Sequence, residues 1–588
     1  MPSALKLEVT DVSASPSSPA GNLETLEPSH LEISSQILSI ISRYKLAKDT
    51  FLAGTKDGTT FLAHIHSKVA AKESILMCLP AFPFKSPNNT AKVFGRLPDK
   101  AEEFALAHLN GLCAAIGDIY TPGARLMIVS DGLVYNDLLG VPDRDVWAYG
   151  EALRALRARK DFRHIEFCRL KDIVHVDVPD ELDEIRYVAN ATNFRHALLQ
   201  QFSKPGYNVS LRISEDEDTC LTYRGYIKFL ETDLQNVYPI GEGRSKSKYK
   251  KGVEYIAKQM LTRGDAFARA VRQRFPDRLR LSIHPSTGEN KLSINLLPTD
   301  TSFTTPWHCS IAFRLDGTVI TGHRSQFDTN EEFELVCEQG RPSYFRERSA
   351  LLSWASEKGG ITCEPVYPTG LVIRPAAGRN SLSVRDVDAA KVRALSQLNS
   401  PIVLRGFART RNRDLLVAKA HEFGVPTPWE FGMPDLNVRG ADTHRVTNFL
   451  SVTEDESETS FSMPPRFQFF AAMIESPKDT KPALFSSSAL LFKHLPAHLS
   501  LPSLHPLTGA ISLSSTITRS LPLVVNHPAT NCLPCNVPKS LRHDRRIAYY
   551  HTWEKGDLLV CDNTVTTLHQ WSDHSAAWNR EIWKIHFE

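Results

Sequence analysis

The sequence predicts an α/β N-terminal domain with a mostly parallel sheet, followed by a mainly β C-terminal domain. The 588 residues suffice for at least two domains, and 42% of them are hydrophobic, enough for sizeable cores. In the first half, buried-strand patterns alternate with amphipathic helix patterns, which is typical of a parallel sheet. Beyond about residue 330, short strand patterns separated by loops indicate a β domain.

The N-terminal elements follow one another in a regular order. Residues 1–30 are rich in serine and proline and predict a disordered tail. Apolar residues then recur at helical spacing over 30–45. Residues 73–84 read as a buried strand that ends in a proline-containing loop, and 98–120 as a helix with acidic residues in its first turn. Residues 122–140 predict a turn, a buried strand and a loop.

The segments after residue 240 set the boundaries of the two expected domains. A basic, glycine-containing loop is expected over 241–251. Two strands are expected around the turn that joins 278–286 to 291–298, and another strand pair within 300–320. These patterns place the first domain at 31–330, a linker at 331–364 and the second domain at 365–588. Strands of the second domain are expected within 367–375, 400–407, 556–570 and 580–588.

Composition excludes several classes of protein. The 69 Lys and Arg residues nearly balance the 66 Asp and Glu residues, so a nucleic-acid or anionic-membrane partner is not expected. Ten cysteines in a chain of this length do not make a disulfide scaffold. We find no apolar run long enough to span a membrane and no signal-peptide pattern at the N-terminus, which together predict a cytoplasmic protein.

Three ordered motifs carry a resemblance to a known family. They are PAFPFKSPNNTAKVFG at 80–95, YRGYIKFLETDL at 223–234 and TTPWHCS at 304–310. Together with RLRLSIHPS at 278–286 they resemble the pyoverdine/dityrosine biosynthesis family, also called the isocyanide synthase family, over about 32–325.

The resemblance implies a reaction and its partners. The amine of an amino acid, with tyrosine preferred, becomes an isonitrile, and ribulose 5-phosphate donates the carbon. No metal or other cofactor is needed for this domain. The setting is fungal secondary metabolism of the xanthocillin type, in which oxygenase or cytochrome P450 enzymes act on the product.

The implied chemistry needs cations for a sugar phosphate and a carboxylate, which lysine and arginine provide. Five candidates for substrate and phosphate binding lie in or beside the matching motifs: Lys85, Lys92, Arg224, Lys228 and Lys291.

The chemistry also needs a general base and a general acid. Histidine suits both because its pKa lies near neutrality, and His284 and His308 are the candidates. Asp131 and Asp137 are candidates for orienting the amine or the sugar hydroxyls.

The second domain resembles the taurine-dioxygenase-like family, whose jelly-roll fold uses Fe(II) and 2-oxoglutarate. Such enzymes hold iron with an H-x-D/E motif and a distal histidine. His569 fits the distal position as a metal ligand, and Arg580 fits as the 2-oxoglutarate ligand. The interval 448–463, where H-x-D is expected, contains no histidine. Iron and 2-oxoglutarate are therefore not expected to bind, and the domain is expected to be degenerate, unless the gap reflects an internal deletion in the gene model.

Two other functions stay open. The sister branch of the family would imply N-formylation of tyrosine for a dityrosine spore wall, and the fused second domain argues against it. A non-catalytic scaffold of a biosynthetic pathway is the other alternative.

Overall fold

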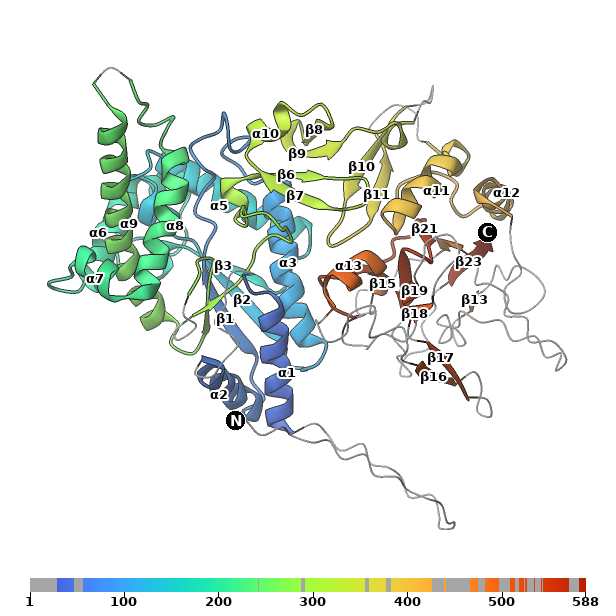
Figure 1. Ribbon diagram of the computed structural model, residues 1–588, viewed down its shortest axis with the longest axis horizontal. Coiled ribbons are helices and arrows are strands. Elements are labelled where there is room, and N and C mark those ends of the chain that lie inside the picture. Colours follow the sequence, from blue (N-terminus) through green and yellow to red (C-terminus); the bar gives the residue numbers. More distant parts are fainter. Residues whose placement is uncertain are drawn as a thin grey trace, which may run out of the picture.

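The N-terminal half of the chain is built on a five-stranded parallel sheet in the order β3-β2-β1-β4-β5, shown in the computed structural model of Figure 1. Its strands are β1 (Ile75–Pro80), β2 (Ala124–Val129), β3 (Ile165–Cys168), β4 (Leu279–Ser282) and β5 (Leu292–Ser293). The strands expected within 73–84 and 122–140 are confirmed, and so is the parallel α/β class.

The structure describes a defined set of segments. They are 29–46, 57–241, 243–286, 291–354, 359–376, 382–425, 438–439, 466–473, 482–495, 508–512, 518–522, 524–525, 533–534, 541, 543–569 and 581–587. The tail expected at 1–30 lies almost wholly outside the described residues.

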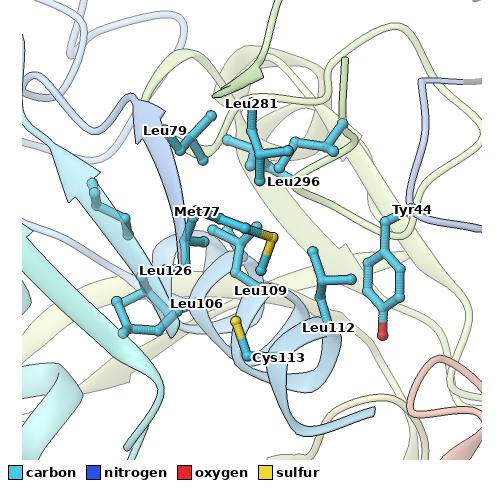
Figure 2. Packing of buried hydrophobic residues seen from close by; sticks show 14 of the residues in the cluster. Tyr44, Met77, Leu79, Leu106, Leu109, Leu112, Cys113, Leu126, Leu281 and Leu296 are labelled. Carbon is cyan, nitrogen blue, oxygen red and sulfur yellow. The ribbon is translucent and has the colours of Figure 1, made fainter. Parts of the chain in front are cut away.

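Alternate residues of β1 face opposite sides of the sheet, and each side has its own apolar cluster. Met77 and Leu79 pack with the first three helices, whereas Cys78 packs with later helices. The first cluster involves α1 (His30–Arg43), α2 (Asp57–Ala70) and α3 (Lys100–Gly117). Figure 2 shows sheet side chains against the inward face of α3, through Met77, Leu79, Leu126, Leu106 and Leu109. Helices on both sides make this a doubly wound sheet.

Helix α5 (Asp143–Arg159) joins α3 on the first side, through Tyr149, Leu153 and Leu156. The second side is covered by the other helices between β2 and β4, which are α4 (Gly132–Tyr135), α6 (Glu184–Phe202), α7 (Val209–Glu215), α8 (Glu217–Asp233) and α9 (Lys246–Arg274). The loop expected over 241–251 is wrong for its second half, because Lys246 already begins α9. The Ser245 side chain accepts a hydrogen bond from the Lys248 backbone and caps the helix.

Two further differences concern the segments after α9. Strands β4 and β5 run parallel, with Leu281 opposite Leu292, and do not form a hairpin. A second sheet of four strands, in the order β7-β6-β9-β8, consists of β6 (Ser310–Phe313), β7 (Val319–Gly322), β8 (Phe333–Glu338) and β9 (Arg341–Glu347). The segment 331–364, expected as a linker, thus contributes two strands to this sheet. Helix α10 (Arg324–Asp328) follows β7.

The C-terminal half is mainly β. Its largest sheet has the order β10-β11-β12-β21-β14-β23-β13, and a three-stranded sheet has the order β20-β15-β22. The strands expected within 367–375, 400–407, 556–570 and 580–588 are all present. The elements are β10 (Ile361–Pro365), β11 (Leu371–Pro375), α11 (Ala389–Leu398), β12 (Ile402–Leu404), α12 (Arg413–Phe423), β13 (Val438–Arg439), β14 (Phe467–Ala472), β15 (Ala483–Ser487), α13 (Ser488–Lys493), β20 (Ala548–His551), β21 (Leu558–Asp562), β22 (Thr566–His569) and β23 (Glu581–Phe587).

Two short hairpins belong to this half as well: β16 (Thr508–Ser512) with β17 (Thr518–Pro522), and β18 (Val524–Val525) with β19 (Leu533–Pro534). In the part of the chain that the structure describes, no helix has both the length and the apolar composition that crossing a membrane requires.

Candidate active site

The candidate site lies at the carboxyl edge of the five-stranded sheet, around β1 and β4. The chain first builds outward from β1 through β2 to β3, and then crosses to the other side of β1 to add β4 and β5. In doubly wound sheets, ligands bind outside the carboxyl ends of the strands where this order reverses. The residues after β1, β2 and β4 therefore lie where a substrate would be expected.

A buried carboxylate, Asp233, is the centre of the first cluster. Its two oxygens contact the Lys92 ammonium and, at 3.0 Å, the Nδ1 atom of His308. Asp233 is the last residue of α8, and His308 ends the short 3-10 helix η3 (Pro306–His308). Burial alone would raise the pKa of Asp233, but its interactions with His308 and Lys92 outweigh this effect and lower the pKa to about 2. Asp233 is therefore an ionised, oriented partner for the imidazole.

His308 is suited to accept a proton. Burial lowers its pKa, although the nearby Asp233 charge opposes the shift. A neutral ring whose Nδ1 atom carries the proton that faces Asp233 would keep its lone pair on Nε2, which is the arrangement of a general base. The Phe229 ring lies 4.4 Å from the His308 ring, between centroids, and limits how the imidazole can turn.

His284 lies in the same region, after β4. Burial lowers its pKa to about 3, and the charges of Lys291 and His308 contribute to the shift. The Tyr226 ring packs edge-on against it, with centroids 5.4 Å apart. His284 is therefore a neutral imidazole at neutral pH. A third histidine, His323, lies nearby. Burial lowers its pKa, and Lys92, Asp233 and His308 also affect that pKa.

Asp131 forms the second cluster, with two tyrosines. It follows β2, and burial raises its pKa to about 7. Its Oδ1 atom is buried and has no hydrogen-bond partner among the described residues. The hydroxyls of Tyr135 and Tyr226 are hydrogen-bonded to each other, and the Asp131 charge acts on both. A carboxyl group near half-ionisation at pH 7, with a free oxygen, can bind or exchange a proton with an amine.

The surroundings of Lys85 differ from those expected for a lysine that binds a substrate phosphate. Its ammonium lies 2.7 Å from Asp99 and 2.8 Å from Glu102, and it donates to the Pro306 carbonyl at 3.1 Å. Its side chain is fully buried, and both carboxylates belong to the start of α3. Burial opposes the charge, but Asp99 and Glu102 still raise the pKa of Lys85 above its usual value. The charge of Lys85 is therefore already neutralised within the fold.

Lys92 is likewise engaged, through Asp233. Asp137 is engaged as well, because Arg263 of α9 binds both of its oxygens at 2.6 and 3.0 Å. Of the remaining cations, Arg224 and Lys228 are exposed on α8, and Lys291 is half-buried near His284. Lys291 is therefore the candidate cation beside the histidines, whereas Arg224 and Lys228 lie on the side of α8 opposite Tyr226.

Sequence reasoning missed part of the site. Tyr226, Phe229 and Asp233 project from one face of α8 at spacings of three and four residues. All three lie in the YRGYIKFLETDL motif, from which only the cations were chosen. The helical spacing was visible, but it could not show which face of the helix meets the histidines.

The expected iron site is not tested. Arg580 and the interval 448–463 lie outside the described residues. His569 is the last residue of β22, opposite Leu484, and only its backbone is described. Within the described segments, no group of three His, Cys, Asp or Glu side chains could hold a metal ion.

The fold and the two clusters define an α/β enzyme with its reactive groups at the carboxyl edge of a parallel sheet. Residues 65–336 match the family described as "Pyoverdine/dityrosine biosynthesis protein". Isocyanide synthase xanB of Aspergillus fumigatus is 38% identical over 94% of this chain and 80% of its own length. Isocyanide synthase A of the same fungus is 30% identical over 96% of this chain and 99% of its own. The chain belongs to the isocyanide synthase family.

Other similarities cover one half of the chain. An L-tyrosine isonitrile synthase of Pseudomonas aeruginosa is 32% identical over 48% of this chain and 83% of its own length. The crystal structure of PvcA from that organism covers 54% of this chain and all of PvcA, at 29% identity and a TM-score of 0.48. The crystal structure of PvcB covers 40% of this chain and 93% of PvcB, at 22% identity and a TM-score of 0.31.

Proposed function

We propose that the N-terminal domain converts the α-amine of an amino acid, tyrosine first, into an isonitrile, with ribulose 5-phosphate as carbon donor and no cofactor. The observation that carries the proposal is the His308–Asp233 pair beside His284 and Asp131 at the carboxyl edge of the sheet. The names of the relatives support the reaction class, and two of them name L-tyrosine as the amino acid.

The roles follow from the chemistry of the groups. An ammonium ion must lose a proton before its nitrogen can attack the sugar ketone, and His308 Nε2 is the proposed base. Asp131 is the proposed partner of the amine, because its free oxygen is buried without a counter-ion. His284 is the proposed second proton carrier as water leaves. Lys291, near His284, is the proposed partner of an anionic group of the substrate.

The test is a product analysis. The purified chain is incubated with ribulose 5-phosphate and the twenty amino acids, with a chelator present, and the products are identified by mass spectrometry. An amino acid that gains one carbon and loses two hydrogens supports the proposal and identifies the substrate. A formyl adduct would instead assign the chain to the reaction expected for the spore-wall branch, to which one relative, a spore wall maturation protein of Saccharomyces cerevisiae, belongs by name. Absence of any product would favour the scaffold.

For the C-terminal domain we propose a jelly-roll fold without oxygenase activity. The absence of a histidine from the interval 448–463, where H-x-D/E is expected, supports this. We expect added Fe(II) and 2-oxoglutarate to leave the product unchanged and to yield no succinate coupled to substrate. Coupled succinate release, read by mass spectrometry, would contradict the proposal. We keep the cytoplasm as the proposed location, and oxygenase or cytochrome P450 enzymes as the proposed consumers of the isonitrile.

A further inference from the structure

The first turn of α3 is held by buried ion pairs on two sides. On one side, Asp99 and Glu102 bind the Lys85 ammonium at 2.7 and 2.8 Å. On the other side, the Lys100 ammonium lies 3.0 Å from Glu103 and 3.1 Å from Glu364. Both lysine side chains are fully buried. One helical turn therefore connects two charged networks, each centred on a fully buried ammonium group.

The first network leads to the candidate active site. The Lys85 ammonium donates to the Pro306 carbonyl at 3.1 Å, and the Ser86 backbone donates to the Trp307 carbonyl at 2.9 Å. Pro306 and Trp307 belong to η3, whose last residue is His308. The position of the imidazole is thus set partly by Lys85.

The second network leads to the C-terminal half. Glu364 lies on β10, the first strand of the large C-terminal sheet. It binds Lys160 at 2.6 Å as well as Lys100, and Glu338 of β8 completes the surroundings of Lys100 at 2.8 Å. The charges of Lys100 and Lys160 outweigh burial and hold the pKa of Glu364 well below its usual range. Glu364 is therefore ionised and fixed between two cations.

We infer that the C-terminal sheet positions His308 through the first turn of α3, and that Glu364 is the positioning residue. Charged hydrogen bonds in a buried network admit few arrangements, so a shift at one member displaces the next. Small displacements of a catalytic group lower the rate of the chemical step strongly. The role assigned to His308 rests on the proposed function, whereas the coupling of the two networks does not.

The test compares both ends of α3. At the other end of the helix, Arg545 of the C-terminal half binds Asp118, the C-cap residue, at 2.9 Å. Asp118→Asn is therefore a matched control, because it weakens a contact between the halves on the same helix but away from Lys85. Glu364→Gln removes the charge of the positioning residue, and Glu364→Asp keeps that charge but shortens its reach.

Hydrogen exchange read by mass spectrometry gives a result that does not depend on turnover. We expect Glu364→Gln to speed exchange in peptides that cover 80–88 and 304–310, and Asp118→Asn to leave both peptides unchanged. In the product assay, Glu364→Gln should lower kcat between about tenfold and a hundredfold, with a smaller change in KM and a shifted pH profile. Glu364→Asp should recover part of kcat.

The contrary outcomes are distinct. Unchanged exchange at 304–310 in Glu364→Gln, or equal effects of the Glu364 and Asp118 variants, would overturn the inference. A uniform rise in exchange over the whole chain, in both Glu364 variants, would also overturn it, since Glu364 would then only stabilise the fold. If the wild-type protein forms no product, the proposed function fails, while the exchange measurement still decides the coupling.

Discussion

At the scale of single residues, Asp233 controls the orientation and the pKa of the His308 imidazole. It orients the imidazole and balances the Lys92 charge in a buried site. Asp233→Asn removes this charge, so His308, the proposed base, loses its orienting acceptor, and we expect kcat to fall about a hundredfold or more. Initial rates of isonitrile formation measure the loss, and circular dichroism confirms that the variant is folded.

The control for this variant is Asp145→Asn, which removes a carboxylate that pairs with exposed Arg96 at 3.0 Å. It should retain the wild-type rate. A wild-type rate in Asp233→Asn would exclude the His308–Asp233 pair as the base.

Lys85 is expected to act on stability. Without its ammonium, Asp99 and Glu102 would face each other in a buried site. Breaking a buried ion pair on one side costs about 3–5 kcal/mol, and we expect this loss of unfolding free energy in Lys85→Met, measured by urea denaturation. Lys68→Met breaks the half-exposed pair with Glu73 and should cost less than about 1 kcal/mol. If Lys85→Met is as stable as the wild type but inactive, this prediction is wrong and Lys85 binds the substrate directly.

Because the pKa of Asp131 is raised, we expect the free energy of unfolding to depend on pH. Its pKa is about 7 in the folded protein because of burial, against about 3.9 in an unfolded chain. The folded state therefore holds the proton more tightly, so this contribution to stability is full below about pH 4 and is lost as the pH rises through 7. Asp131→Asn should be more stable than the wild type at about pH 8, by about 1–4 kcal/mol, and equally stable below about pH 4. A difference that does not change with pH would contradict this.

At the scale of elements, the site depends on how closely the loop after β1 approaches α4. A Cβ atom on Gly132 would lie 2.5 Å from the Pro83 carbonyl oxygen and 2.6 Å from a Val146 methyl group. Since the carbonyl belongs to the backbone, Gly132→Ala must displace the loop, and we expect it to cost about 1–3 kcal/mol. The melting temperature measures the effect.

Gly252 provides the matched control for this substitution. It lies within α9, and a Cβ atom there meets nothing within 4 Å. Gly252→Ala should stabilise the protein by about 0.5–1 kcal/mol, because alanine favours helix. Equal effects of the two substitutions would show that the loop accommodates a side chain at Gly132.

Helix α8 shows how far sequence reasoning reached at this scale. A family motif marked the helix, and its spacing of three and four residues was visible in the sequence. Asp233 and Tyr226 were still missed, because helical periodicity cannot tell which neighbours a face will meet. The loop expected at 246–251 was wrong for a related reason, since lysines suit an exposed helix as well as a loop.

At the scale of the whole molecule, the two halves are joined by ion pairs around the buried Lys100 ammonium as well as by apolar contacts. Lys100, Lys160 and Glu364 lie far apart in the sequence, yet they form one network between α3, α5's C-terminal cap and β10. His108 of α3 also pairs with the Tyr367 hydroxyl at 2.6 Å. A chain of two independent domains joined by a linker would not need such contacts.

The sequence by itself predicted the strands within 73–84 and 122–140, the parallel α/β class and, through a family resemblance, the two candidate histidines. These depend on local periodicity and on motifs that are contiguous in the chain. Only the tertiary structure decided that Lys85 is neutralised, that Asp137 pairs with Arg263 and that Asp233 orients His308. The physical reason is that the charge state and freedom of a side chain depend on burial and on partners, and folding brings these partners together from distant parts of the chain.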